Sequence, residues 1–414
     1  MASTLVREKI TGVATAGLTA ALVAMSACSS PSLFGQDAGK PTPDSSAPND
    51  ASPMSATYCG RGVDVIDVVP PAGFCLKHYA QVDEPRAMVV ADNGDVLVAA
   101  PSRGTPGGAS GGKGAILILT DDDHDGLATS SVFLDGLEDV HGLALGGGFL
   151  YFTRQETVFK LPFTAGQRVA NGTPTDLKLP ATFAGGGRWT HGLAISKSGQ
   201  LYASRGEYGT CGASHGGEIS SVGAGGALTT LASGLRNPMY MNCHYADDTC
   251  AAMELGDDLH EGAREKMILL RPDTNFGFPC CYTTKKPEMT GAACDDVTTE
   301  DAFFELTETP FGFDWERGLW PEPFKGGIFV ALHGSAYSSP EWQGARVVYA
   351  PTSPTSHAPT QDWTTFLSGF GPGGSVLDRP ADVKFGPDGR LFIADDASDH
   401  VYWMAPTTLA APTN

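Results

Sequence analysis

Arginine and histidine side chains stand at the start of several short apolar segments, where they could bind an anion and move a proton. An arginine guanidinium binds carboxylates through paired hydrogen bonds, and a histidine can accept a proton near neutral pH. The positions of this kind, with two polar neighbours, are Arg86, His141, Arg188, His191, Arg236, Asn237, Arg379 and Asp382. If they meet in the folded chain, they predict one site that combines both capacities.

A second candidate site is the acidic run Asp121-Asp122-Asp123-His124-Asp125-Gly126. Asp121, Asp123 and Asp125 fill positions 1, 3 and 5 of a calcium-binding loop, and glycine stands at position 6. Position 12 is Val132, where an EF-hand loop has glutamate. The run therefore predicts either a calcium site with a partial ligand set or a solvated hairpin turn.

The segments that carry the arginines and histidines repeat along the chain. Each copy is an apolar strand, a tight turn with glycine and a second apolar strand, as in Pro85–Ala99, His141–Thr153, His191–Ser204 and Pro380–Ala394. Glycine suits such hairpin turns because it accepts a positive φ. A weaker copy starts at Asn237, and another strand pair surrounds Ile328–Leu332. The copies recur about every fifty residues, a period typical of propellers.

These repeats predict an all-β fold, a six-bladed β-propeller, with an elaborated stretch between Leu255 and Pro323. Helical periodicity is scarce, and short apolar runs bounded by Gly, Pro, Asp and Asn dominate. Five or seven blades stay open as alternatives. Because the first strand of each propeller blade lines the central channel, we expect the side chains that start the repeats to converge near the axis.

Several segments resemble the glucose/sorbosone dehydrogenase family, whose members use pyrroloquinoline quinone (PQQ). They follow one another in the family's order and are Leu119–Gly126 with Phe133–Leu137, Gly234–Pro238, Asn275–Pro279, Phe329–Ser335, and Arg379–Val383 with Asp388-Gly389 and Asp395-Asp396. The resemblance implies an enzyme that removes a hydride from a C–H bond of a sugar or polyol while a base takes the hydroxyl proton. PQQ and Ca²⁺ are the implied cofactors, and the electron acceptor stays open.

The resemblance also implies which residues hold the cofactors. PQQ carries several carboxylates, so its site needs arginine or lysine. Arg236 and Arg379 would contact PQQ, with Asn237 beside them, and His333 lies in the segment that resembles the sorbosone branch. The calcium ligands would come largely from backbone carbonyls of the loop that corresponds roughly to residues 254–261.

Two departures from the family pattern bear on catalysis. The family has a His-Trp-Thr-Arg-like segment where this chain has Arg188-Trp189-Thr190-His191, so the base and the cation exchange places. Arginine cannot act as a base at neutral pH, and we expect His191 to serve instead, with Arg188 and Glu207 near it. A packed, structural histidine is the alternative, because His141 has the same position in its repeat. In addition, residues 336–338 are Ala-Tyr-Ser in place of the sorbosone branch's Trp-Asn-Arg, which removes a cation.

These departures leave two other classes of function open. One is a non-catalytic propeller that binds a carbohydrate or a protein at the cell surface. The other is a calcium-dependent, lactonase-like hydrolase, since such enzymes share the propeller architecture. The axial cluster of Glu, Asn and Asp metal ligands expected for a lactonase is not evident in this sequence.

The first residues predict export to the cell envelope. Arg7 and Lys9 precede an uncharged run, Ile10–Ala27, which ends in small residues before Cys28, as in a secretory signal. The segment resembles a bacterial lipobox, with Met25 where leucine is usual, so we expect Cys28 to be lipidated. We expect a signal peptide over residues 1–28, a disordered Ser/Pro/Ala-rich tether over 29–56, the propeller over 57–406 and a tail over 407–414. The lipid alone would then attach the protein to a membrane, preferably the outer membrane.

The cysteine count and the charge agree with an exported protein. Nine cysteines are present, and the eight that remain beyond Cys28 form an even set, which predicts disulfides. Proximity predicts Cys59–Cys75 and Cys243–Cys250, whereas the pairing of Cys211, Cys280, Cys281 and Cys294 stays open. The net charge of −20 argues against nucleic acid and against electrostatic docking on anionic lipid. It is compatible with neutral or cationic partners.

Overall fold

The computed structural model describes residues 55–412, apart from 67, 102–113, 155–156, 184–187, 189, 214–215, 258–262, 284–285, 288–293, 336–343 and 372–376. The predicted signal peptide, Cys28 and nearly all of the predicted tether lie outside the described residues, as do Trp189 and the Ala-Tyr-Ser segment at 336–338. Within the described residues, no helix combines the length and the apolar character of a membrane span.

The strands of the described residues form six blade sheets, whose main strands are antiparallel, and a separate two-stranded hairpin. Blade 1 contains β2 (Met88–Val90), β3 (Val96–Ala100), β4 (Gly114–Thr120) and β5 (Thr129–Leu137). Blade 2 contains β6 (Val140–Gly146), β7 (Phe149–Arg154), β8 (Thr157–Pro162) and β9 (Thr175–Asp176). Blade 3 contains β10 (Leu193–Ile195), β11 (Leu201–Arg205), β12 (Gly217–Val222) and β13 (Leu228–Leu235), and β17 (Thr274–Asn275) joins β13 in parallel.

The later blades follow the same plan. Blade 4 contains β14 (Asn237–Cys243), β15 (Cys250–Leu255), β16 (Glu265–Leu269) and β20 (Ala302–Phe304). Blade 5 contains β21 (Pro310–Trp315), β22 (Ile328–Leu332), β23 (Arg346–Ala350) and β24 (Thr364–Leu367). Blade 6 contains β25 (Pro380–Phe385), β26 (Leu391–Asp395), β27 (His400–Pro406) and β1 (Phe74–Gln81). The remaining elements are the hairpin β18 (Cys281–Thr283) and β19 (Lys286–Pro287), and two 3₁₀ turns, η1 (Tyr58–Gly60) and η2 (Ala224–Gly226).

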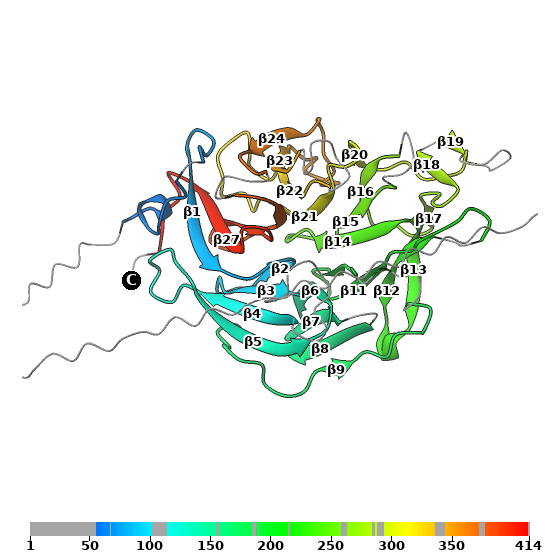
Figure 1. Cartoon of the computed structure of the whole chain (residues 1–414), viewed down its shortest axis with the longest axis horizontal. Coiled ribbons are helices and arrows are strands. Elements are labelled where there is room, and N and C mark those ends of the chain that lie inside the picture. Colours follow the sequence, from blue (N-terminus) through cyan, green and yellow to red (C-terminus); the bar gives the residue numbers. More distant parts are fainter. Residues whose placement is uncertain are drawn as a thin grey trace, which may run out of the picture. The chain divides into compact units, whose positions relative to one another are not determined.

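The blades close into a ring. The innermost strands β2, β6, β10, β14, β21 and β25 contact one another in this order, and β25 contacts β2. Blade 6 is completed by β1, which pairs with β27 in a register that runs from Phe74 opposite Pro406 to Gln81 opposite His400 (Figure 1). The two ends of the propeller chain are thus joined in one sheet, and the predicted six-bladed β-propeller is confirmed.

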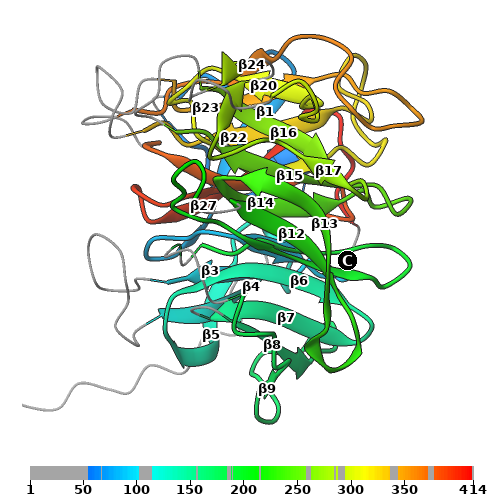
Figure 2. The ribbon, with the colours of Figure 1, turned by 90° about the vertical axis from the view of Figure 1, so that its right-hand side faces the viewer.

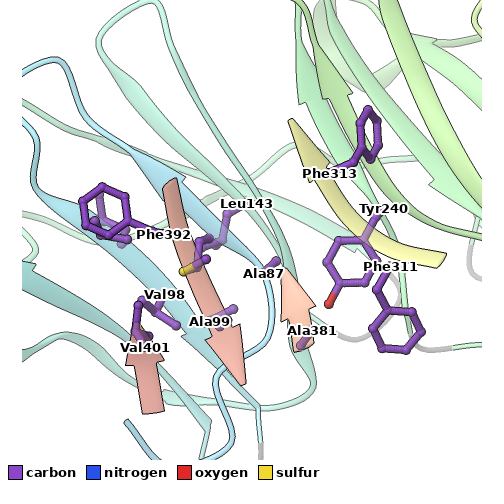
Figure 3. Packing of buried hydrophobic residues seen from close by; sticks show 14 of the residues in the cluster. Ala87, Val98, Ala99, Leu143, Tyr240, Phe311, Phe313, Ala381, Phe392 and Val401 are labelled. Carbon is purple, nitrogen blue, oxygen red and sulfur yellow. The ribbon is translucent and has the colours of Figure 1, made fainter. Parts of the chain in front are cut away.

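The core lies between neighbouring sheets. β3 and β4 are buried along their whole length, because inner strands are covered on both faces and need no alternation of polar side chains. β5, at the outer edge of the same sheet, is largely exposed. Figure 3 shows alanines 87, 99 and 381 among larger side chains such as Leu143, Phe311 and Phe392, so small and large residues alternate where the blades converge.

Four disulfides connect the described cysteines. Cys59–Cys75 and Cys243–Cys250 confirm the pairs predicted from proximity. The pairs left open are Cys211–Cys280 and Cys281–Cys294. The C-terminal segment beyond β27 is not a free tail over its described part, because Ala411 N donates to Ala56 O and Tyr58 N donates to Leu409 O.

Hydroxyl side chains link consecutive blades near the axis. Thr153, in β7, accepts a hydrogen bond from Gly142 N and donates to the carbonyl of His191 in the next blade. Ser204, in β11, accepts from Gly192 N and donates to the carbonyl of Pro238 in the next blade. Glycine is required at both positions, since a Cβ on Gly192 would lie 2.8 Å from Met239 O and one on Gly142 would overlap His191 O.

Candidate functional site

Apart from the acidic run and Cys28, the predicted site residues lie at one end of the propeller, which we call the entry face. Innermost strands begin there and second strands end there, because the two are antiparallel. Arg86 precedes β2, Arg379 precedes β25 and Arg236 precedes β14, while His333 follows β22 and Asp396 follows β26. The residues that stand at the starts of the predicted repeats therefore lie on one face of the propeller.

Four of these side chains form a network that we call the arginine cluster: Arg86, His333, Arg379 and Asp396. Arg86 Nη2 lies 2.9 Å from Asp396 Oδ2, and His333 Nε2 donates to the same oxygen at 3.0 Å. Arg379 Nη2 donates to His333 Nδ1 at 2.9 Å, and its Nε lies 3.9 Å from Asp396 Oδ1. Two guanidiniums from two blades thus share one carboxylate.

Burial sets the charge states in this cluster. Burial would raise the pKa of Asp396, but Arg86 and His333 outweigh it and hold the pKa below its ordinary value. Burial lowers the pKa of His333 to about 4, despite the nearby Asp396. His333 is therefore neutral at pH 7, with its proton on Nε2. The Arg86 and Arg379 side chains are 22% and 19% exposed, against 3% for Asp396, so the cations reach the surface while their shared anion does not.

Aromatic rings close the axis beside the arginine cluster. Phe311 stacks on His333 at a centroid distance of 4.1 Å, and Tyr240 stacks on Phe311 at 5.2 Å. His141 meets the edge of Tyr240 at 5.0 Å. Figure 3 shows Tyr240 next to Phe311, with its hydroxyl on the side of Ala87 and Ala381. Blades 2, 4 and 5 contribute this layer of rings, which packs against the arginine cluster through His333.

The other predicted residues gather around the end of β11. A Cβ on Gly206 would approach Asn237 Oδ1 and Arg188 Cγ, which places both side chains beside this glycine. The Arg188 guanidinium lies 3.7 Å from the ring centroid of Tyr208. Glu207 is ion-paired with Arg205 at 2.8 Å, and its N–H donates to the carbonyl of Arg236.

Arg236 is anchored to the loop predicted to supply calcium ligands. Its backbone N–H donates to Glu254 Oε1, its Nη1 donates to Gly256 O, and its Nη2 lies 4.0 Å from Asp257. The other Glu254 oxygen pairs with Lys266 at 3.0 Å. Residues 258–261 of this loop lie outside the described residues.

His191 is completely buried in this structure. Its Nδ1 lies 2.9 Å from Ser204 O, so Nδ1 carries the proton, and its ring packs against Phe183 at 4.9 Å. Burial lowers its pKa to about 4. The Nε2 atom is unprotonated and has no hydrogen-bond partner among the described residues. His141 has a matching arrangement, since its Nδ1 contacts His191 O at 3.3 Å.

The acidic run lies at the opposite end, which we call the exit face, because it follows the third strand of blade 1. Carboxylate oxygens of Asp121, Asp123 and Asp125 lie close enough together to hold one cation. Asp121 is also paired with the buried Arg390 at 2.9 Å, which compensates part of the negative charge. The run is therefore separate from the arginine cluster.

Sequence reasoning identified Arg86, Arg379 and His333 but did not assign Asp396, which joins all three. The sequence feature that could have identified Asp396 is the Asp395-Asp396 pair at the end of the last repeat. Phe311 and Tyr240 were also missed, because a stacked ring in a channel has the same sequence character as an ordinary core residue.

Comparisons with known proteins agree on the fold. No protein-family model matches the sequence, and no curated protein matches it. Solved structures do match. The holo form of the pyranose dehydrogenase PQQ domain from Coprinopsis cinerea is 18% identical, with a TM-score of 0.62 over 83% of this chain and 99% of that one. The calcium structure of a Trichoderma reesei carbohydrate-active enzyme of family AA12 is also 18% identical, with a TM-score of 0.62 over 83% and 98%.

A bacterial structure gives a similar result. The PQQ-bound form of aldose sugar dehydrogenase from Streptomyces coelicolor is 18% identical, with a TM-score of 0.55 over 81% of this chain and 99% of that one. At this level of identity the comparisons establish that the chain shares the propeller fold of these proteins.

Proposed function

We propose that this protein is a PQQ-dependent dehydrogenase of a sugar or polyol, and that it works at the cell envelope. The arginine cluster is the observation that carries this proposal. Two arginines from different blades share one buried carboxylate, and both guanidiniums reach the surface of the entry face. Such a site suits a planar ligand with several carboxylates, because guanidiniums bind carboxylates in a paired geometry.

The residues present fit PQQ in charge. Arg379 and Arg86 would hold its carboxylates, Arg236 and Asn237 would contact it from blade 4, and the rings of Phe311 and His333 would support the site from the axis. Bound PQQ supplies a two-electron acceptor for the hydride. Calcium, with ligands from the loop 254–261, would polarise it, and a second calcium would occupy Asp121, Asp123 and Asp125.

We assign the hydroxyl proton of the substrate to His191. Its ring is neutral at pH 7, and its unprotonated nitrogen is Nε2 (above), the state a general base requires. Arg188 and Glu207 lie around the neighbouring Gly206 and would orient the substrate. Replacing His191 by Asn should lower kcat with little change in PQQ affinity, whereas equal losses of both would indicate a purely structural residue.

The binding experiment uses the purified protein, PQQ and Ca²⁺. PQQ binding is followed by quinone absorbance, and turnover by dye reduction with a panel of aldoses and polyols. Arg379→Ala and Arg86→Ala should weaken PQQ binding about tenfold to a hundredfold, as expected for loss of a charge-assisted hydrogen bond. Arg168→Ala is the control, because Arg168 pairs with Asp95 and Asp122 away from the entry face. Absence of PQQ binding would contradict the proposal.

A non-catalytic binding propeller is the second candidate. It is favoured by the complete burial of His191 and by the matching contacts of His141, which explain both histidines as structural. A protein that binds a carbohydrate but neither binds PQQ nor reduces the dye would support this candidate.

We also propose that Cys28 carries the lipid that holds the protein at the envelope. The disulfides of the described residues are typical of an extracytoplasmic protein, which supports export. Cys28→Ser should release the protein from the membrane fraction of the producing cell. Unchanged fractionation would contradict lipid attachment.

A further inference from the structure

A cluster of two histidines and an aspartate lies on the exit face, away from every residue used above. His244 and Asp247 belong to the hairpin between β14 and β15, and His357 belongs to the loop between β23 and β24 (Figures 1 and 2). β14 is seven residues long, so about 20 Å separates this hairpin from Asn237. The cluster therefore cannot belong to the arginine cluster.

The three side chains converge on one point. His357 Nε2 lies 2.8 Å from Asp247 Oδ2, and His244 Nδ1 lies 3.7 Å from Asp247 Oδ1. The two imidazoles are stacked, with centroids 3.6 Å apart and planes 12° apart, so one ring must turn about its Cβ–Cγ bond for both nitrogens to point at one ion. All three ligand atoms lie within 4.8 Å of one another.

These spacings are close to those of metal ligands. Two atoms that bind one tetrahedral Zn²⁺ at about 2.0–2.2 Å are roughly 3.3–3.6 Å apart. The measured 2.8 Å and 3.7 Å lie just outside that range, and the shorter is a hydrogen bond that the ion would replace. Two imidazoles and one carboxylate are ligands typical of Zn²⁺ and related first-row divalent ions, whereas Ca²⁺ and Mg²⁺ prefer oxygen alone.

The surrounding structure holds the ligands in place. The Cys243–Cys250 disulfide closes the hairpin, and Thr249 N donates to Asp247 Oδ1 at 2.9 Å. Trp315 packs edge-on against His244 and donates its indole N–H to the carbonyl of His357 at 3.1 Å. Ala246 N donates to His244 Nδ1 at 3.3 Å, a long hydrogen bond that an ion bound at this nitrogen would replace. Such outer contacts orient ligands and support metal affinity.

The cluster is most exposed to solvent at Asp247. The Asp247 side chain is 47% exposed, whereas those of His244 and His357 are 6% and 11% exposed. An ion can therefore enter past Asp247, and water can complete its coordination. On binding, the ion takes the place of the Nε2 proton of His357, which moves to Nδ1 of the same ring.

We propose that His244, Asp247 and His357 form a site for a Zn²⁺-class divalent cation that ties the β14–β15 hairpin of blade 4 to the β23–β24 loop of blade 5. The residues come from positions 110 apart in sequence, so the bound ion is a cross-link between neighbouring blades. The site is independent of the proposed PQQ chemistry.

The test uses the purified full chain without a histidine tag, after treatment with a chelator. Zn²⁺ titration should give one high-affinity ion per chain, and Co²⁺ should give the visible absorption of a tetrahedral nitrogen/oxygen site. Zn²⁺ should raise the thermal unfolding midpoint. Asp247→Asn and His357→Ala should weaken Zn²⁺ binding by at least about a hundredfold, since even outer-shell contacts account for 10–100-fold.

Two control variants separate this site from other places where an ion could bind. His400→Ala removes a histidine that stacks on Tyr402 and meets the edge of His78 in blade 6, and Asp176→Asn alters a carboxylate that pairs with Lys178 in blade 2. Both should bind Zn²⁺ like the unaltered chain. No stoichiometric Zn²⁺ and no Co²⁺ absorption in the unaltered chain would overturn the proposal, as would equal binding by Asp247→Asn and His357→Ala, whether or not a variant is less stable.

Discussion

Asp396 is the residue on which the arginine cluster depends. It is the one carboxylate contacted by Arg86, His333 and Arg379 within the described residues. Without it, two guanidiniums and a histidine would face one another in a poorly solvated site. The ion pairs of such a network offset their desolvation only while each partner is present.

Asp396→Asn should therefore lower the free energy of unfolding by about 3–5 kcal/mol, the cost of leaving a buried charge uncompensated. Denaturant unfolding under oxidising conditions measures the change. Asp122→Asn is the control, because the exposed Asp122 pairs with Arg168, which keeps a second partner in Asp95, and the Asp122 pair should contribute at most about 1 kcal/mol. Equal effects of the two substitutions would show that the cluster is not electrostatically coupled.

The buried histidines predict how stability depends on pH. Burial lowers the pKa of His191 and His333 to about 4 and that of His141 to about 3, from an ordinary 6.5. A lowered pKa means that the unfolded chain takes up protons first as the pH falls. Their contribution is fully present above pH 6.5 and is lost as the pH falls toward 4, at up to about 1.4 kcal/mol per pH unit for each histidine.

Unfolding free energies measured between pH 7 and pH 4.5 should show this slope. His141→Gln should reduce it by the share of one histidine, whereas His400→Gln, in which the imidazole is less buried, should leave it nearly unchanged. A pH-independent stability over this interval would contradict the buried, neutral state of these rings.

The hydroxyl links between blades are the main feature at the level of elements. Ser204 serves two blades at once, because it accepts from Gly192 N and donates to Pro238 O. Thr153 repeats the arrangement one blade earlier. The histidine before each glycine then has its position fixed by the same contacts, which explains why His-Gly recurs in blades 2 and 3.

Ser204→Ala should destabilise the fold by about 1–3 kcal/mol, because a buried N–H and a buried carbonyl lose their shared partner. Ser221→Ala is the matched control, since the Ser221 hydroxyl bonds to Thr229 O at an exposed position, and we expect a change within about 0.5 kcal/mol. Amide hydrogen exchange at Gly192 should accelerate in Ser204→Ala alone. Unchanged exchange there would show that the link does not hold the blades.

At the scale of the whole molecule, stability depends on ring closure by β1. Phe74, at the start of β1, packs on Trp320, Phe324 and Phe366 of the blade 5 region. The strand that completes blade 6 is thereby fixed to its neighbour as well as to β27. Cys59–Cys75 anchors the same strand to the segment before it.

Phe74→Ala should lower the free energy of unfolding by about 3–5 kcal/mol through lost burial and the cavity that remains. Val69→Ala, at a side chain that is almost fully exposed, is the control and should change little. Chemical denaturation followed by tryptophan fluorescence reports both. A small effect of Phe74→Ala would mean that the ring closes without this contact.

The fold and two of the four disulfides could be predicted from sequence, because each depends on local pattern. Short stretches of sequence are enough to identify hairpin turns with glycine, runs of β-forming residues and a fifty-residue period. A cysteine that lies 7 or 16 residues from another has few alternative cysteines nearby with which it could pair. The convergence of Arg86 and Arg379 followed from the same period, because repeat starts share one face of a propeller, whereas His333, which follows β22, came only from the family resemblance.

The remaining features required the folded ring. Asp396 serves three partners from other segments, and His357 meets Asp247 across 110 residues, separations at which spacing in sequence carries no information on distance. Burial also decided the protonation of His191 and His333, since the number of covering atoms depends on all neighbouring blades. Local sequence thus specified the repeating hairpins and their common face, whereas partners, burial and charge state depended on contacts between strands that only blade packing brings together.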